Sequence, residues 1–271
     1  MFWLTALWAL SCWAADDLIR SDAQVFTLDN GMTVVLEENH RTDQVALFLH
    51  YGVGARDELD GERGLAHLFE HLMFEGSRNV PGGAFDEWLT SAGGQNNAYT
   101  SEDETAYHET FPSGALNLVL FLESDRLGFL EDGLTQENLS NQQQIVLQER
   151  ARGYNEPNGK DWDAITRLSF PTSHPYHVPV IGTVADIEEV SLETVKAFFK
   201  KHYRSEGAVL GLVGNFKTDE ALKAIKHWFK DVPNTPRETS RVVTWDNKPQ
   251  GNRGWIQDPQ DTKDCVSLTR T

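Results

Sequence analysis

The sequence predicts a protein of the α+β class, in which runs of strand and runs of helix share one chain. Residues 25–28 and 32–37 are apolar or alternate in polarity, and they flank an Asp-Asn-Gly turn at 29–31, which is a typical hairpin signal. Apolar residues then recur at helical spacing, first over 65–74 and later over 116–130. The chain has 271 residues, of which 39% are hydrophobic, so it can bury the core of one large domain or two small ones.

The other predicted elements follow from the same two periodicities. Strands are predicted at 45–51 and 209–213, and helices at 85–91, 138–154, 190–203 and 219–229. Ser191 stands at the expected N-cap of the helix over 190–203, with Thr194 in its first turn. Helix and strand therefore alternate through most of the chain.

Two stretches combine features that point in different directions. The segment 95–107 is polar, yet its tyrosines, threonines and alternation favour a strand over a loop. A strand with so few apolar anchors is expected at the edge of a sheet or facing a wet cavity. The helix over 116–130 is strongly apolar but carries Glu123, Asp125 and Arg126. We interpret these charges as a structural ion-pair cluster without a role in catalysis.

The most informative stretch is 65–74, where His67, Glu70 and His71 form the pattern His-x-x-Glu-His in a mostly apolar helix. Residues four apart share a helix face, so both imidazoles can bind one Zn²⁺ ion. Glu70 flanks them, where a carboxylate can take a proton from a metal-bound water. The alternative is a pair of core histidines bonded to backbone carbonyls. That alternative must bury two imidazoles and a carboxylate side by side in an apolar helix, which is costly without a partner. A metal ion supplies one, so the sequence favours zinc.

The helix over 138–154 supplies a candidate third ligand. Ile145 and Val146 precede Glu149 by four and three residues, so Glu149 is expected on their buried face. A buried carboxylate must be paired, hydrogen-bonded or bound to metal. The alternative to a metal is a salt bridge to Arg150 or Arg152, although both arginines point elsewhere on the helix. Spacing alone leaves both interpretations open.

The composition excludes several classes of protein. The net charge is −17, which argues against nucleic-acid binding and is compatible with cationic peptide substrates. The two cysteines, Cys12 and Cys265, lie near opposite ends of the chain and offer neither a disulfide framework nor a cysteine-based metal site. Chemistry in this chain is therefore expected to depend on histidines and carboxylates.

The N-terminal residues resemble a secretory signal peptide. Residues 2–14 form an uncharged apolar run that is too short to span a bilayer, and Ala14 and Ala15 precede a polar stretch. The run departs from the signal-peptide pattern because no Lys or Arg precedes it. The alternative to a signal peptide is an ordinary buried segment at the N-terminus. No later stretch is suited to a transmembrane helix. We therefore expect residues 1–15 to be a signal peptide, and the protein to be periplasmic or secreted without a membrane span.

Several segments together resemble the pitrilysin (insulinase-like) zinc peptidases, a family that includes the mitochondrial processing peptidase and many bacterial members. The pattern is closest to bacterial members related to that processing peptidase, and it covers about 25–236. The matching segments are 28–31, 64–71 with 74–77, 93–107, 122–126, 146–150, 174–176 through 181–182, and 213–216. As a set these motifs are highly specific.

The resemblance implies a role for each residue of the predicted metal site. His67 and His71 match the two histidine ligands of the family, and Glu149 matches its distal glutamate ligand. Glu70 matches the general base. The implied cofactor is one Zn²⁺ ion per chain.

The resemblance also implies a peptide-binding strand and one departure from the family pattern. Asn97 and Ala98 fall on the edge strand to which family members add an extended peptide by backbone pairing. The position seven before Glu149, often a second glutamate in the family, is Gln142 here. A supporting charge is thus expected to be lost, with a somewhat lower metal affinity.

The implied fold is an antiparallel-rich mixed sheet with helices packed on one face. We expect an N-terminal catalytic domain of the zinc-peptidase type over 16–237, followed at 238–271 by a linker and the start of a second homologous domain. In the family this second half supplies an arginine and, six or seven residues later, a tyrosine that hold substrate and stabilise the oxyanion. No Arg–Tyr pair at that spacing occurs in this sequence.

The predicted function is that of a zinc metalloendopeptidase half that hydrolyses extended peptides or unfolded polypeptides, with Glu70 as the general base. One alternative is a non-catalytic binding subunit, although such relatives usually lose the zinc motif, which is whole here. The second alternative is an incomplete or partner-dependent subunit. That subunit would bind zinc and peptide but would need a second homologous half, in cis or in trans, for turnover.

Overall fold

A curved six-stranded sheet organises the fold, with strand order β1-β2-β6-β3-β5-β4. The computed structural model describes residues 21–234, 253–255 and 267–269. In the sheet, β2 and β6 run parallel and the other neighbours run antiparallel. The strands are β1 Gln24–Thr27, β2 Thr33–Glu38, β3 Gln44–Tyr51, β4 Gln95–Thr100, β5 Thr105–Pro112 and β6 Ala208–Gly214.

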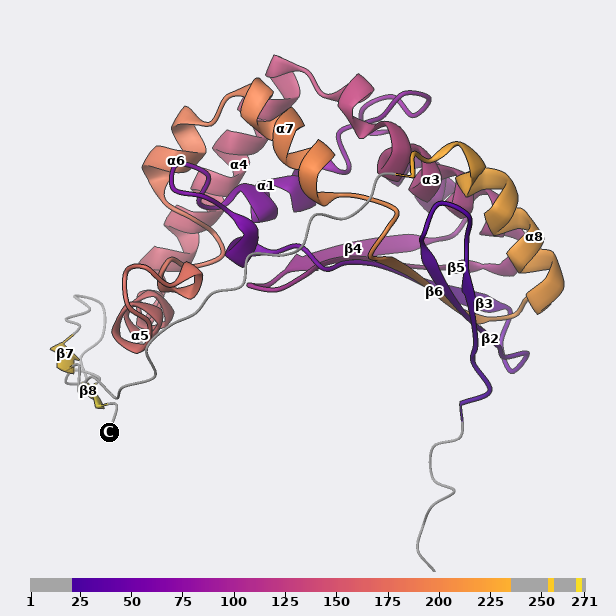
Figure 1. Ribbon diagram of the computed structural model, residues 1–271, viewed down its shortest axis with the longest axis horizontal. Helices are drawn as coiled ribbons and strands as arrows, with labels where there is room; N and C mark the ends of the chain where they lie inside the picture. Colours follow the sequence, from indigo (N-terminus) through magenta and orange to yellow (C-terminus); the bar gives the residue numbers. More distant parts are fainter. Residues whose placement is uncertain (1–20, 235–252, 256–266, 270–271) are drawn as a thin grey trace, which may run out of the picture.

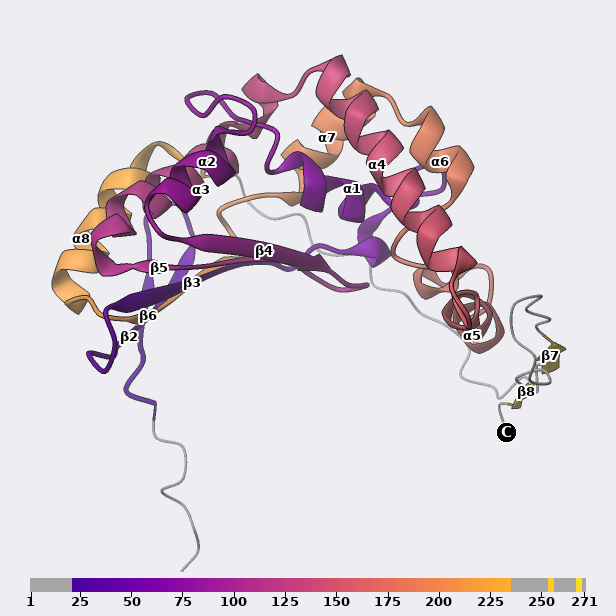
Figure 2. The ribbon, with the colours of Figure 1, turned by 180° about the vertical axis from the view of Figure 1, so that it is seen from behind.

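The helices gather on one face of this sheet, as the two opposite views show (Figures 1 and 2). They are α1 Leu65–Leu72, α2 Ala84–Ser91, α3 Leu116–Gly133, α4 Gln136–Asn155, α5 Asp161–Ser169, α6 Val184–Glu189, α7 Leu192–His202 and α8 Thr218–Trp228. Short 3₁₀ helices add η1 Ala55–Asp57, η2 Ser113–Ala115, η3 Pro175–His177 and η4 Phe229–Asp231. The predicted α+β class, with an antiparallel-rich mixed sheet and helices on one face, is confirmed.

The core lies between the sheet and the helices because the strands alternate in polarity. Along β3, Val45, Leu47, Leu49 and Tyr51 are buried and the residues between them are more exposed. An antiparallel sheet with this alternation has one face on the core and one face toward solvent. Phe48, on the open face, is 37% exposed.

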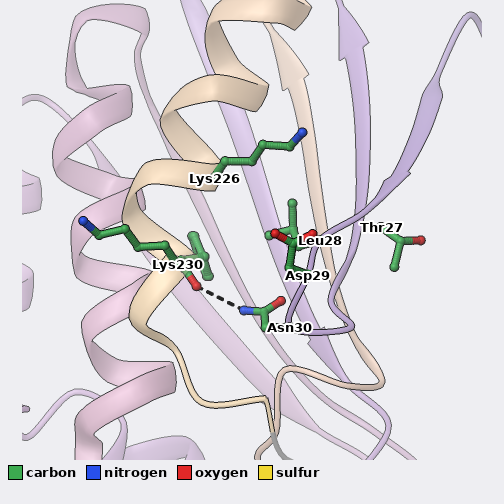
Figure 3. Close-up of a pocket in the computed structure, with 7 residues that line it drawn as sticks. Thr27, Leu28, Asp29, Asn30, Lys226 and Lys230 are labelled. Carbon is green, nitrogen blue, oxygen red and sulfur yellow. Dashed lines mark hydrogen bonds between the residues drawn. The ribbon is translucent and has the colours of Figure 1, made fainter.

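The predicted hairpin at 29–31 joins β1 to β2 and is held by Asn30. The Asn30 side chain donates to the Phe229 carbonyl at 3.1 Å and accepts from the Met32 N–H at 3.2 Å. Gly31 has φ +83°, a conformation that favours glycine. The turn therefore packs against the end of α8, beside a small pocket of about 180 Å³ near Lys226 (Figure 3).

The prediction of one strand over 95–107 was wrong. This segment contains a hairpin, with β4 and the start of β5 joined by a turn at 101–104. The Ser101 N–H donates to the Glu104 carbonyl at 2.8 Å, and the Ser101 hydroxyl accepts from the Asp103 N–H at 3.2 Å. A serine hydroxyl can form such a turn without glycine or proline, which is why the pattern concealed it. Of these two strands, β4 lies at an edge of the sheet and β5 does not.

The predicted ion-pair cluster on α3 is confirmed for Glu123 and Arg126 but not for Asp125, which is hydrogen-bonded to neutral groups. Arg126 is 1% exposed, and its guanidinium donates to Glu123 at 2.7 Å and to Glu109 at 3.1 Å. Asp125 accepts from the Asn79 side chain at 2.6 Å. Burial raises the pKa of Glu109 far above its usual range, and the nearby Glu123 carboxylate adds to this effect. One guanidinium thus stabilises a buried acidic pair away from the candidate site.

The remaining elements were predicted in part. Ser191 caps α7 and accepts from the Thr194 N–H at 3.1 Å, as predicted. The short helices α5 and α6 were not predicted. The expected signal peptide at 1–15 lies outside the described residues, as does most of 238–271, apart from β7 Arg253–Trp255 and β8 Ser267–Thr269, which pair antiparallel. Within the described residues, no helix combines the length and apolar character needed to cross a bilayer.

Candidate active site

The two histidines of the predicted motif lie on α1, where it packs beside α4 (Figures 1 and 2). The His67 and His71 rings are 5.1 Å apart between centroids and nearly perpendicular. Their Nε2 atoms lie 3.8 Å and 3.5 Å from the same carboxylate oxygen of Glu149 on α4. The structure therefore brings together the three residues that the sequence named as candidate ligands.

The local sequence explains why α1 turns its histidines toward α4. Leu65, Leu68, Phe69 and Leu72 are buried, so this apolar stripe faces the core. The Phe69 ring stacks on Tyr203 at 4.9 Å between centroids. The opposite face of the helix is left for the polar residues of the motif.

The expected burial of Glu149 was wrong. Its side chain is 51% exposed and Ile145 is 45% exposed, whereas Val146 is fully buried. The contacts of α4 with α1, rather than burial on α4 itself, direct the Glu149 carboxylate to the imidazoles. Among the described residues its ion pairs are with the two histidines. Arg150 instead donates to the Gly182 carbonyl at 3.1 Å.

The donor set fits Zn²⁺. The ligand atoms of His67, His71 and Glu149 all lie within 4.8 Å of one another. Metal–ligand bonds of about 2.0–2.1 Å in tetrahedral geometry place ligand atoms about 3.3 Å apart. The observed distances of 3.5 Å and 3.8 Å to Glu149 are close to this value. Two imidazoles and one carboxylate are also the ligands of known catalytic zinc sites with one open position.

The surroundings of His67 favour its neutral imidazole. Burial lowers its pKa, opposed by the neighbouring Glu70 carboxylate, so the neutral imidazole is favoured. Its Nδ1 atom is buried and finds no hydrogen-bond partner among the described residues. The alternative of a core histidine satisfied by backbone carbonyls therefore does not describe His67.

Glu70 is oriented toward the edge strand. The Thr100 hydroxyl on β4 donates to the Glu70 carboxylate at 2.7 Å. This bond connects the candidate base to the strand that was predicted to pair with peptide. Thr100 was not identified from the sequence, because it is thirty residues from Glu70 along the chain and their contact depends on the packing of α1 on β4.

The outer edge of β4 carries Asn97 and Ala98. The Ala98 N–H donates to the Asn97 side-chain oxygen at 2.9 Å, so this backbone group does not pair with β5. Since β4 is the last strand of the sheet, its outer edge is available for a further strand. In this chain an asparagine side chain occupies one donor of that edge.

The Gln142 side chain has a hydrogen-bond partner near the end of α1. Its amide donates to the Glu75 carboxylate at 2.5 Å, and Asn138 donates to the same carboxylate at 3.2 Å. Glu75 follows α1, so the helix end retains an acidic group although residue 142 itself is neutral. A glutamate at 142 would place two carboxylates in contact, which is unfavourable.

Glu58 is a second residue that sequence reasoning missed. It is 2% exposed and accepts from the backbone N–H groups of Gly64 and Ala66, at 3.0 Å and 2.8 Å. Burial raises its pKa to about 8, opposed by these two hydrogen bonds. The only signal in the sequence was a glutamate seven residues before the start of α1.

Comparison with known proteins finds two family matches along the chain. A sequence profile described as insulinase (peptidase family M16) matches residues 33–164. A second, described as the peptidase M16 inactive domain, matches residues 189–268. The two matches meet in one sheet, since β2 pairs with β6.

Individual relatives agree with the profiles. The zinc protease PqqE of Helicobacter pylori is 31% identical over 210 residues, covering 77% of this chain and 47% of PqqE. A protease structure from Helicobacter pylori is 28% identical with a TM-score of 0.77, covering 82% of this chain and 53% of that one. The first half of the periplasmic protease PqqL from Escherichia coli is 25% identical with a TM-score of 0.76, covering 86% and 51%.

The chain spans about half the length of the curated relatives it matches. The first family match, over 33–164, includes the residues of the candidate metal site, and the Helicobacter pylori relative is named a zinc protease. The chain therefore belongs to the insulinase-like peptidases, family M16.

Proposed function

We propose that this chain is the zinc-binding catalytic half of a metallopeptidase that hydrolyses extended peptides. The observation that carries the proposal is the convergence of His67 and His71 on Glu149, with Glu70 beside them and bonded to the edge strand through Thr100. His67, His71 and Glu149 would hold one Zn²⁺ ion. When bound, the ion supplies Lewis-acid chemistry at the scissile carbonyl.

Glu70 performs the proton transfers in this proposal. Its carboxylate takes a proton from the attacking water and passes it to the nitrogen of the leaving amine. The Thr100 hydroxyl fixes one carboxylate oxygen by donating to it at 2.7 Å. The other oxygen remains available for the water.

The substrate lies along β4 as an added strand. Pairing through the outer edge of β4, at Asn97 and Ala98, orients the peptide backbone beside Glu70, because Thr100 lies two residues beyond Ala98 on the same strand. Main-chain pairing recognises extended or unfolded polypeptides of many sequences. The Asn97 side chain must release the Ala98 N–H for the peptide to pair there.

Substitution of one histidine tests the metal site. Purified protein is expected to hold about one Zn²⁺ ion, and His71→Ala is expected to lose most of it, because two of three protein ligands cannot maintain the site. Metal content after dialysis is the measurement. The matched control is His227→Ala, an exposed histidine on α8 at the far end of the sheet. Undiminished zinc in His71→Ala would refute the site.

Substitution of Ala98 tests the peptide-binding edge. Proline at 98 removes the outward N–H, and edge strands tolerate proline where that group does not serve the sheet. We expect zinc content to be unchanged. The KM for an extended peptide is expected to rise by about tenfold, because one backbone hydrogen bond is lost and the proline ring conflicts sterically with the peptide. Ala98→Ser, which retains the N–H, is the control. Equal KM values for both variants would exclude pairing at Ala98.

A second candidate function is favoured by the length of the chain relative to its relatives. A partner-dependent subunit would bind zinc and peptide but would reach full turnover only with a second homologous half, in cis or in trans. Residues 16–237 would then form the catalytic domain, and 238–271 the linker and the start of that half. The comparison supports this proposal because the chain covers only 47% of PqqE.

We also propose export from the cytoplasm. Residues 1–15 have the apolar run and small residues of a signal peptide. The related structure from Escherichia coli is described as a periplasmic protease. These two observations support a periplasmic or secreted location.

A further inference from the structure

The N-terminal end of α1 is capped by a carboxylate from outside the helix. Glu58 lies after η1, and both of its oxygens accept from α1 backbone groups, the N–H of Gly64 and the N–H of Ala66. The first N–H groups of a helix have no partner within the helix, so acceptors from outside the helix must satisfy them. Gly64, at the N-cap, has no side chain to supply this bond itself. Glu58 therefore determines where α1 begins, at Leu65, two residues before His67.

The same end of α1 is in backbone contact with the loop before α6. A Cβ atom at Gly64 would lie 2.9 Å from the Ile181 carbonyl oxygen, and one at Gly182 would lie 2.2 Å from the Arg63 carbonyl oxygen. Both glycines have positive φ, +98° and +78°. Contacts this close leave no room for a side chain, so the two loops can meet only through glycines.

Arg150 attaches this contact to α4. Its Nε–H donates to the Gly182 carbonyl at 3.1 Å, and its guanidinium lies over the Tyr154 ring at 4.1 Å from the centroid. Arg150 is the residue after Glu149. An unbroken series of contacts therefore leads from Glu58 through the start of α1 and Gly182 to the helix that carries Glu149.

We propose that Glu58 and Arg150 are positioning residues that together set the separation between the His67/His71 pair and Glu149. The inference rests on the proposed zinc site. Glu58 fixes α1 along its axis, and Arg150 holds α4 to the same point through Gly182. Because α1 has only eight residues, a displacement of its first turn moves His67 directly. Residues that orient metal ligands without touching the metal typically change its affinity by about 10–100-fold.

The test is a pair of substitutions and their combination. In Glu58→Gln, only one oxygen can accept, and the amide NH₂ is turned toward a backbone N–H. In Arg150→Met, the donor to Gly182 is removed while much of the side-chain volume remains. The matched controls are Asp60→Asn, a fully exposed side chain in the same loop, and Arg152→Met, an exposed arginine on the same helix. Zn²⁺ affinity is measured by competition with a chelator, and unfolding in urea is measured on metal-free protein.

Each single variant is expected to lower Zn²⁺ affinity by about tenfold or more, and the controls to change it by less than about twofold. The double variant is expected to lose less than the product of the single effects, because both residues act on one contact. Unchanged Zn²⁺ affinity with weaker metal-free folding would show a merely structural role and overturn the inference, as would strictly multiplicative effects. If Glu58→Gln does not fold, Arg150→Met decides the question alone. Failure of the unsubstituted protein to bind zinc would instead refute the proposed function.

Discussion

Glu70→Gln is expected to retain zinc while peptide hydrolysis falls by at least ~10²-fold. Glutamine has the size of glutamate and keeps an oxygen that can accept from the Thr100 hydroxyl, so the local geometry is preserved. It cannot take a proton from water, and general-base catalysis of this kind contributes about 10²–10⁴-fold. The variant therefore distinguishes a general base, whose loss lowers hydrolysis alone, from a zinc ligand, whose loss also lowers zinc content.

The matched comparison is Glu149→Gln, which should weaken zinc binding because an amide oxygen is a poorer ligand than a carboxylate. Zinc content and cleavage of a quenched fluorogenic peptide are measured on both variants at one protein concentration. Equal loss of zinc from the two variants would contradict the assignment of Glu70 as base and Glu149 as ligand. Unchanged hydrolysis in Glu70→Gln would remove Glu70 from the mechanism.

Addition of a homologous C-terminal half is expected to raise peptide cleavage by residues 16–271 by about 10²–10³-fold. The first half holds the candidate metal ligands, the base and the edge strand, but its sequence contains no Arg–Tyr pair at the family spacing. Removal of one donor to a developing oxyanion costs about 10²–10³ in rate. A second half would also exclude water, which strengthens the electrostatic interactions in the site.

The experiment measures the rate of cleavage of the quenched peptide in three samples. The first contains residues 16–271 alone, and the second also contains the C-terminal half. The third contains a C-terminal half whose arginine and tyrosine are both replaced by alanine. The substituted half should close the site without supplying the donors, so it should restore little of the rate. Efficient zinc-dependent cleavage by residues 16–271 alone would overturn the prediction. Peptide binding by fluorescence anisotropy, measured in parallel, should be detectable in all three samples.

The local pattern of the sequence was sufficient for the elements that contain the chemistry. Apolar spacing placed α1, and the spacing of His67 and His71 alone put both imidazoles on one face. The Asp-Asn-Gly turn placed the first hairpin, and the three charges of α3 were recognised as structural. These features depend on residues close together in the chain, where helical and strand periodicity act directly.

The position of Glu149 was decided by the tertiary structure. The periodicity of α4 indicated a buried face, but the side chain is half exposed and reaches the histidines because α4 crosses beside α1. Helix periodicity states which residues share a face, and not what that face will meet. The resemblance to a family, rather than the spacing, had named Glu149.

The contacts that support the site were also invisible in the sequence. Thr100 reaches Glu70 across thirty residues, and Arg150 reaches Gly182 across thirty-two. Glu58 caps α1 from a position seven residues before the helix start. The sequence by itself determined which side chains can bind zinc and move a proton. Their distances and orientations were decided by the packing of α1 against β4 and α4, because such contacts join residues that no local pattern relates.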